Sequence, residues 1–377
     1  MNNNLSMIHP TRARISLRAF HHNMNVVRSC VGKKVKILAV VKANAYGHGM
    51  NRLAMEAIRM GADYLGVARV HEGLFLRECG IEKSILVFEV IPERFLQAAL
   101  KNDLLFTVSS IEGARKISAG ATKWRMKARV HIKLDTGMGR LGLDPRTAVA
   151  NVEKIAGMGR IDVEGIYSHF ATSDEPEKRF AREQLRKFTG LVEDIQRKGI
   201  EIPLMHMANS GGIIAFPESH FDMVRPGIML YGYTPRYKMR SKWHLVPVMS
   251  LLSEVSHIKR ISKGTSISYG RRYHASRETC IATVPIGYAD GMPRILTNNV
   301  EVLIRGMRFP AVGTICMDHL MVDVGTEGAV SVGDEVVLIG KSGREQITAW
   351  DLALRLQSIP YEVTCMVSAR VPREYVL

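Results

Sequence analysis

The sequence lacks the long apolar segments that mark membrane-spanning and secreted proteins. Nowhere do about eighteen apolar residues follow one another, which excludes a transmembrane helix. The opening segment, residues 1–10, has no basic stretch followed by an apolar one, so a secretory signal is not predicted. We therefore expect a soluble, cytoplasmic protein with no membrane partner.

Cysteine is scarce and scattered. The chain has only five, which are Cys30, Cys79, Cys280, Cys316 and Cys365. No two of them form a C-x-x-C pair, and no Cys/His spacing suits tetrahedral zinc. The sequence therefore predicts reduced thiols and no metal site.

Acidic residues are too few to balance the basic ones. The chain has 52 Lys and Arg against 36 Asp and Glu, a net charge of +16, which raises the question of nucleic-acid binding. However, short basic groups such as 33–36 and 238–242 are separated by long neutral segments, and aromatic residues are few. No nucleic-acid-binding motif is present. We interpret the basic groups as solvated faces and expect no nucleic-acid partner.

No G-x-G-x-x-G segment opens a predicted helix, which argues against a dinucleotide-binding fold. Apolar runs instead alternate with helical patterns. The eight runs begin at Ile37, Tyr64, Ile85, Leu105, Ala128, Val163, Pro203 and Met223, the last two extending to Ser210 and Tyr231. Within residues 50–58, apolar side chains recur with the spacing of a helix, and Gly61 is suited to end that helix. Eight alternating units predict an α/β fold with an N-terminal (β/α)₈ barrel, residues 1–244.

The pattern changes after Trp243 to short alternating strands with turns. The predicted strands are 250–256, 279–284, 300–304, 320–324 and 335–339, and one helix is predicted over residues 349–356. We expect a separate β-rich domain over residues 245–377, because 377 residues exceed what one core usually supports.

The segment 37–49 is the most informative part of the chain. A buried apolar strand ends on Lys42 and then breaks into a small-residue, glycine-rich turn. The carboxyl ends of parallel strands carry functional groups, and a partly desolvated amine there can act as a nucleophile toward aldehydes. The alternative is a surface lysine that closes a strand with its amine in solvent.

Other polar residues follow the predicted barrel strands, where they would converge on one face. They are Lys133, Asp135, Arg140, His169, Asn209, Ser210 and Arg225. Residues 209–212 and 225–228 follow strands seven and eight, where barrels commonly bind phosphate through backbone N–H groups. A lysine together with a phosphate site suggests pyridoxal phosphate. Each piece alone is weak, since Asn-Ser-Gly-Gly also suits a simple turn.

At this point the chain resembles the alanine racemase family, fold-type III enzymes that depend on pyridoxal 5'-phosphate. The resemblance extends from about Thr11 to the C-terminus. It rests on the ordered segments 39–49, 133–142, 168–170, 208–210, 225–232, 268–270, 285–291 and 316–318.

The resemblance implies a role for each residue of the cofactor site. Lys42 holds the cofactor covalently through its amine and serves as one of two bases. The residues that contact the phosphate of the cofactor would be Tyr46, Ser210, Gly227 and Ile228.

Arg225 is similar to the residue that faces the pyridine nitrogen. Guanidinium does not easily give up a proton, so the ring nitrogen would stay unprotonated. By the same resemblance His169 fixes Arg225, Asn209 belongs to the cofactor site, and Arg140 binds the cofactor's phenolic oxygen and the substrate carboxylate. Lys133 corresponds to a lysine that some family members carbamylate.

Racemisation removes a proton from one face of the substrate and returns it to the other, so two bases are needed. The resemblance makes Tyr269 the second base. It also implies a homodimer, in which Tyr269, Tyr288, Met317 and Asp318 act on the partner's cofactor and substrate. Without the resemblance, Tyr269 would read as a turn residue.

Two departures from the family pattern stand out. Ala369 occupies a position where many alanine racemases have a tyrosine, which puts the width of the substrate pocket in question. The segment 12–17 also lacks the acidic residue usual there, a change that we expect to affect only local charge.

The expected function is interconversion of L- and D-alanine, which would supply D-alanine for peptidoglycan. The alternatives are a racemase of broader or shifted specificity, such as one for serine, and a fold-type III decarboxylase. A decarboxylase would need an acidic partner for the pyridine nitrogen, and Arg225 speaks against it. A pyridoxal-phosphate homeostasis protein would end near residue 240, before the domain that carries Tyr269.

Overall fold

The computed structural model describes residues 9–239, 242–325 and 328–377, which form two compact units. The barrel unit consists of His21–Ala45 and Met50–Leu245. The β-rich unit takes in the described residues up to Phe20, the segment Tyr46–Gly49 and Val246–Leu377. No helix within the described ranges is long and apolar enough to cross a membrane.

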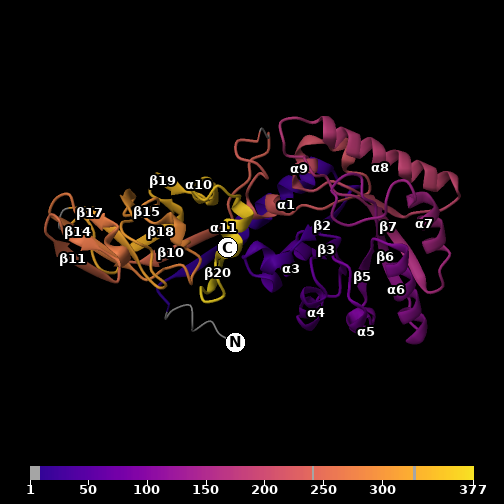
Figure 1. The fold of residues 1–377 in the computed structure, drawn as a ribbon, viewed down its shortest axis with the longest axis horizontal. Coiled ribbons are helices and arrows are strands. Elements are labelled where there is room, and N and C mark those ends of the chain that lie inside the picture. Colours follow the sequence, from indigo (N-terminus) through magenta and orange to yellow (C-terminus); the bar gives the residue numbers. More distant parts are fainter. Residues whose placement is uncertain (1–8, 240–241, 326–327) are drawn as a thin grey trace. The chain divides into compact units, whose positions relative to one another are not determined.

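Eight parallel strands form the centre of the barrel unit (Figure 1). They are β2 (Lys36–Val40), β3 (Tyr64–Val67), β4 (Ser84–Val87), β5 (Leu104–Val108), β6 (Ala128–Lys133), β7 (Ile161–Tyr167), β8 (Leu204–His206) and β9 (Met223–Val224). Each strand from β2 to β7 pairs with the next along the chain, and β9 pairs with β2, so that β8 and β9 are the two ends of the sheet. Backbone hydrogen bonds from Asp222 to Met205 (3.1 Å) and from Arg225 to Ala208 (2.9 Å) join the two ends of the sheet. The predicted (β/α)₈ barrel is confirmed.

Helices cover the outside of the strands, as the alternating pattern requires. They are α1 (Leu17–Val31), α3 (Met50–Arg59), α4 (Val70–Glu78), α5 (Leu96–Lys101), α6 (Ile111–Lys123), α7 (Ala148–Ala156), α8 (Arg179–Arg197) and α9 (Ser210–Ala215). In α8 the apolar stripe of Leu185, Phe188, Val192 and Ile195 is buried. Strands β3 and β5 are buried along their whole length, which explains their uninterrupted apolar sequence.

Helix α3 ends as its sequence predicts. Gly61 has a φ of +84°, the left-handed conformation that glycine adopts without strain, and its N–H donates to the carbonyl of Ile58.

Two of the predicted barrel strands are shorter than their apolar runs. The eighth ends at Val224, and Ile228–Tyr231 forms a 3₁₀ helix, η3, instead of continuing the strand. Pro226 and Gly227 interrupt the run, because proline removes a backbone donor from the ladder. The seventh strand likewise ends at His206, before Asn209 caps α9.

The described residues of the β-rich unit form three sheets. The largest has the order β16, β15, β18, β10, β1, β20, with β19 on β18. These strands are β1 (Arg12–Ser16), β10 (Met249–Glu254), β15 (Glu301–Ile304), β16 (Met307–Pro310), β18 (Glu335–Ser342), β19 (Glu345–Ile347) and β20 (Arg373–Val376). The smaller sheets contain β11 (His257–Ile261), β14 (Thr279–Val284) and β17 (Leu320–Gly325), and the pair β12 (Ser266–Ile267) and β13 (Tyr273–His274).

The structure differs from the expected domain organisation at the N-terminus. Strand β1 pairs antiparallel with β10 and parallel with β20, so residues expected at the start of the barrel belong to the β-rich unit. The second difference is a helix that the sequence did not predict. Besides the predicted helix α10 (Ala349–Arg355), the unit contains α11 (Pro360–Met366), which begins on a proline.

Candidate active site

The barrel unit has basic side chains after several of its strands. Lys42 follows β2, Lys133 ends β6, His169 follows β7 and Arg225 follows β9. Burial lowers the pKa of His169 most, and the charges of Arg225, Lys133, Arg140 and Lys42 lower it further, to well below its usual value. Nη2 of Arg225 lies 3.3 Å from Nδ1 of His169, so these two predicted residues are in contact, and the charges of the other three act on the same imidazole.

A left-handed turn follows Lys42. Ala43, Asn44 and Ala45 have φ values of 51°, 53° and 52°, and Tyr46 continues at 53°. Each such residue costs about 1 kcal/mol or more, so the turn needs outside support. Oδ1 of Asn44 accepts a hydrogen bond from the N–H of Met50 at 2.9 Å.

The buried carboxylate of Glu72 supplies more of that support. Its Oε1 accepts the N–H of Ala43 at 2.7 Å, and its Oε2 accepts the N–H groups of Ala68 and Arg69 at 2.7 and 3.0 Å. Glu72 was not among the predicted site residues. The available signal was its place three residues after the cap of α4, where a carboxylate completes a capping box.

Lys133 is an amine in a cationic environment. Its side chain is buried, with the ring of Tyr167 5.8 Å from its Nζ. Burial and the charges of Arg140, Arg225 and Lys42 lower the pKa of Lys133 to about 8, although Asp135 acts in the opposite direction. About a tenth of this amine is therefore uncharged at pH 7, and the uncharged fraction rises with pH.

Arg225 is held by hydrogen bonds on two sides. Nη1 donates to Nδ1 of His206 at 2.7 Å, and Nη2 donates to the carbonyls of Ser168 at 2.7 Å and Met207 at 3.0 Å. Nη2 also lies 3.3 Å from Nδ1 of His169, which was expected to fix it. His206, which the sequence reasoning did not single out, makes the shorter contact. Burial lowers the pKa of Arg225 to about 10.

The predicted phosphate loops meet at Ser210. Its Oγ accepts hydrogen bonds from the N–H groups of Gly227 at 3.0 Å and Met229 at 3.3 Å, so it ties the start of α9 to the start of η3. Asn209 caps α9 through the N–H of Gly212 at 2.9 Å. Because Ser210 accepts both bonds, its own hydroxyl proton can donate to an anionic ligand. Ile228, in the same loop, is fully buried.

The remaining predicted residues lie in the β-rich unit. The hydroxyl of Thr314 donates to the carbonyl of Tyr269 at 2.6 Å. The carbonyl of Thr314 accepts a hydrogen bond from the hydroxyl of Ser268, also at 2.6 Å. The Tyr269 side chain is 72% exposed. Tyr46 also belongs to this unit, where its ring packs on that of Tyr361 at 5.7 Å.

Backbone hydrogen bonds connect the loops that carry the predicted substrate residues. The N–H of Tyr288 donates to the carbonyl of Cys316 at 3.0 Å, and that of Ala289 to Met317 at 3.1 Å. Arg370 then bridges two carboxylates, lying 2.8 Å from Asp318 and 3.5 Å from Asp290. The structure thus places Tyr288, Met317 and Asp318 in one cluster, which is contacted by Arg370, the residue that follows Ala369.

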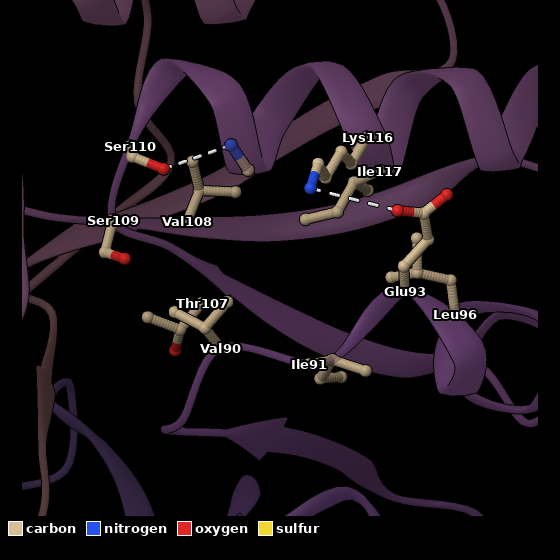
Figure 2. Close-up of a pocket in the computed structure, with 11 residues that line it drawn as sticks. Val90, Ile91, Glu93, Leu96, Thr107, Val108, Ser109, Ser110, Lys116 and Ile117 are labelled. Atoms are coloured by element: carbon tan, nitrogen blue, oxygen red, sulfur yellow. Dashed lines mark hydrogen bonds and ion pairs between the residues drawn. The ribbon is translucent and has the colours of Figure 1, made fainter.

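A small pocket lies elsewhere in the barrel unit, beside β5 and α6 (Figure 2). Val90, Ile91 and Leu96 give it an apolar wall, and an ion pair between Lys116 and Glu93 at 3.8 Å crosses it. None of the predicted site residues lines this pocket. Among the described residues, no three His, Cys, Asp or Glu side chains are grouped as a metal site would need.

Comparison with known proteins identifies the family. Residues 15–235 match the model for the N-terminal domain of alanine racemase, and residues 248–375 match the model for its C-terminal domain. The chain belongs to the alanine racemase family. A member from Caldanaerobacter subterraneus, alanine racemase 2, is 43% identical over 98% of this chain and 95% of its own length.

Solved structures agree with that membership. Alanine racemase from Clostridium difficile is 40% identical, covers 97% of this chain and 96% of its own, and superposes with a TM-score of 0.94. A histidine racemase from Leuconostoc mesenteroides is 30% identical, covers 98% of both chains, and has a TM-score of 0.90. The alanine racemase family depends on pyridoxal 5'-phosphate, which confirms the cofactor expected from the sequence.

Proposed function

We propose that this chain interconverts L-alanine and D-alanine, using pyridoxal 5'-phosphate bound to Lys42. The observation that carries the proposal is the buried guanidinium of Arg225, held from behind by His206 and two carbonyls. An arginine keeps its own protons and leaves the pyridine nitrogen unprotonated, which suits racemisation better than decarboxylation. Membership of the alanine racemase family supports the same reaction.

The residues present fit the cofactor. Pyridoxal phosphate is an anion with an aldehyde, a phenolic oxygen and a ring nitrogen. The hydroxyl of Ser210 and the loop at Gly227 and Ile228 would bind the phosphate, while Lys42 would bind the aldehyde carbon and Arg140 the phenolic oxygen. When bound, the cofactor withdraws electrons from the substrate Cα and makes its proton acidic. We propose that Tyr46 is a further phosphate contact.

Lys42 and Tyr269 would act as the two bases, one on each face of the substrate. Tyr269 is exposed, as are Tyr288 and Met317, at 43% and 52%. Exposed side chains with catalytic roles need a surface to complete the site. We propose a homodimer in which these residues and Asp318 serve the cofactor of the partner subunit.

The direct test is an assay of the purified, yellow protein with L-alanine, L-serine and L-histidine, measuring the D-enantiomers. Histidine is included because the racemase from Leuconostoc mesenteroides shares this architecture. D-alanine formed fastest would support the proposal, and we infer that it then supplies peptidoglycan synthesis in the cytoplasm. Loss of CO₂ from any substrate, or preference for serine or histidine, would contradict it.

We expect Ala369→Tyr to narrow the substrate range. Ala369 is exposed, and the next residue, Arg370, pairs with Asp318, so we propose that a tyrosine ring at position 369 would occupy space next to the substrate side chain. Excluding one small group is worth about 1–3 kcal/mol, so the ratio of kcat/KM for serine to that for alanine should fall about tenfold. Ala369→Ser is the matched control, since it adds little volume. An unchanged ratio would show that this position does not set specificity.

We expect Lys133 to be carbamylated. The uncharged amine attacks CO₂, a nitrogen–carbon bond forms, and the amine loses a proton, which leaves an anionic carbamate able to pair with Arg140. With a pKa of about 8, the reactive amine becomes more abundant as the pH rises through that value, so occupancy should rise too. Isotopically labelled bicarbonate should give a carbamate NMR signal in wild type and none in Lys133→Gln. A signal that persists in the variant would place the carbamate elsewhere.

A further inference from the structure

Four polar side chains form a continuous row through the interior of the barrel unit. Arg225 donates to Nδ1 of His206 at 2.7 Å, and Nε2 of His206 lies 2.8 Å from Nδ1 of His131. Nε2 of His131, which has no hydrogen-bond partner within the described part of the chain, then faces Oε1 of Glu164 at 4.0 Å, beyond hydrogen-bond length. His131 and His206 are completely buried, and Glu164 is 16% exposed. The proposed reaction gives His131 and Glu164 no role, and it gives His206 only that of holding Arg225.

Arg225 determines where the protons of both histidines lie. Guanidinium has donors only, so Nδ1 of His206 must be an unprotonated acceptor and Nε2 must carry the hydrogen. That hydrogen points at Nδ1 of His131, which must in turn be an acceptor. His131 therefore carries its own hydrogen on Nε2, directed at Glu164. Every donor in the row points the same way, from Arg225 toward the carboxylate.

Both histidines are kept neutral, as this order requires. Burial and the nearby charge of Arg225 hold the pKa of His206 well below its usual value. Burial lowers the pKa of His131 as well, although Glu164 opposes the change. An additional proton on either ring would bring a second cation against Arg225 in a desolvated interior.

The far end of the row is firmly anchored. Oε1 of Glu164 accepts the hydroxyl of Tyr64 at 2.6 Å, and Oε2 accepts Nε of Arg129 at 2.8 Å. Burial raises the pKa of Glu164, but His131, Arg129 and Tyr64 together outweigh burial and bring it to about 2. The carboxylate is therefore charged throughout the neutral range.

Strand β7 makes room for the row at Gly165. A Cβ atom at that position would lie only 2.6 Å from Nδ1 of His131. Any side chain there would displace the ring from its hydrogen bond with His206. The pairing of β6 with β7 also shifts register between Val130 and His131, next to this contact.

We propose that Glu164 is a positioning residue for Arg225 and acts on it through His131 and His206. The proposal rests on the function proposed above, in which Arg225 faces the cofactor's ring nitrogen. The aligned imidazole dipoles place their negative ends toward Arg225 and their positive ends toward Glu164, so each group stabilises the charge of the other.

Arg225 needs such a remote counter-charge. Within the described ranges of the chain, no carboxylate forms an ion pair with it, and its direct partners are neutral imidazoles and carbonyls. A buried cation held only by neutral groups is costly. The row offsets part of that cost and also fixes the plane of the guanidinium group from one side.

The experiment compares the holoenzyme with its Glu164→Gln variant, which keeps the shape of the side chain and removes its charge. In protein labelled with nitrogen-15 at histidine, the Nε2–H protons of His131 and His206 should both move upfield, because the carboxylate charge no longer polarises the row. Each signal is assigned by its loss in a single His→Asn variant. We expect kcat for alanine to fall about tenfold, with KM nearly unchanged, because no member of the row beyond Arg225 contacts the substrate in the proposed site.

Two further variants separate this effect from general disturbance. Asp103→Asn removes the other carboxylate on Arg129, 2.9 Å from its Nη1, and should move neither histidine signal. Tyr64→Phe removes the competing donor on Oε1 and should move the His131 proton in the opposite direction, downfield. This second variant keeps the proposal testable if Glu164→Gln does not fold.

Unmoved histidine signals in Glu164→Gln would overturn the proposal, as would an equal shift in Asp103→Asn or an upfield shift in Tyr64→Phe. These signals do not depend on catalysis. If the wild type fails to racemise alanine but the histidine protons respond as expected, the proposed function fails and the coupling of Glu164 to Arg225 stands. If the wild type racemises alanine and the protons do not respond, only the coupling fails.

Discussion

A Lys42→Ala variant is expected to lose racemase activity by at least about a thousandfold, because one substitution removes both the covalent anchor of the cofactor and one of the two bases. Lys42 follows a strand whose last four residues are buried and precedes a left-handed turn of four residues. No other predicted site lysine has such a turn after it. The variant protein should also lose the yellow colour of the wild type, because it lacks the amine that binds the cofactor's aldehyde carbon.

Chemical labelling gives the same prediction a readout that does not depend on activity. Borohydride reduction of the wild type, followed by peptide mapping, should place the pyridoxyl group on Lys42. Lys42→Arg keeps the positive charge and should still fail, whereas Lys101→Ala, on the exposed end of α5, should be unaffected. The competing amine is Lys133, whose pKa is also lowered. A pyridoxyl group on Lys133 would refute the assignment of Lys42.

The barrel could be predicted from the sequence because its signals are local. Completely buried parallel strands must be apolar on both faces, so runs such as Leu104–Val108 are visible without any partner. The helices between them show a 3.6-residue period, and Gly61 and Gly199 end two of them with positive φ. The strand ends then fix where polar residues gather.

Pairing over long distances could not be predicted in the same way. Strand β1 lies between β10 and β20, more than two hundred residues later in the chain, and nothing in its own five residues indicates that placement. The segment Tyr46–Gly49 also belongs to the β-rich unit, because it packs on residues that come much later in the chain. Gly47 packs so closely on the backbone of Thr364 that a Cβ atom would lie 2.0 Å from its carbonyl oxygen.

The residues near the cofactor site also fall into two groups, those that a local motif reveals and those whose contacts depend on the folded barrel. Lys42, Ser210 and Arg225 stand in recognisable motifs, so they could be proposed from the sequence. His131 and His206 stand alone in apolar strands, where a histidine gives no sign of its partner. Their contact depends on the register of β6, β7 and β8, which only the folded barrel provides.

Mixing two inactive variants is expected to restore activity, because the proposed site takes its two bases from different subunits. Lys42→Ala and Tyr269→Phe should each be nearly inactive alone. Tyr269 lies in the β-rich unit with its side chain 72% exposed, whereas Lys42 belongs to the barrel unit. In a heterodimer of the two variants, one site combines both substitutions and the other combines neither.

The expected recovery follows from two-fold symmetry. Equal amounts of the two variants, exchanged freely, give heterodimers as half of all dimers, and half of the sites in each are intact. Activity should therefore reach about a quarter of the wild-type value. Mixing Lys42→Ala with Lys42→Arg is the matched control and should recover nothing, because every site in that mixture lacks the lysine. If the first mixture also stays inactive while mass spectrometry shows that heterodimers have formed, Lys42 and Tyr269 must act from the same subunit.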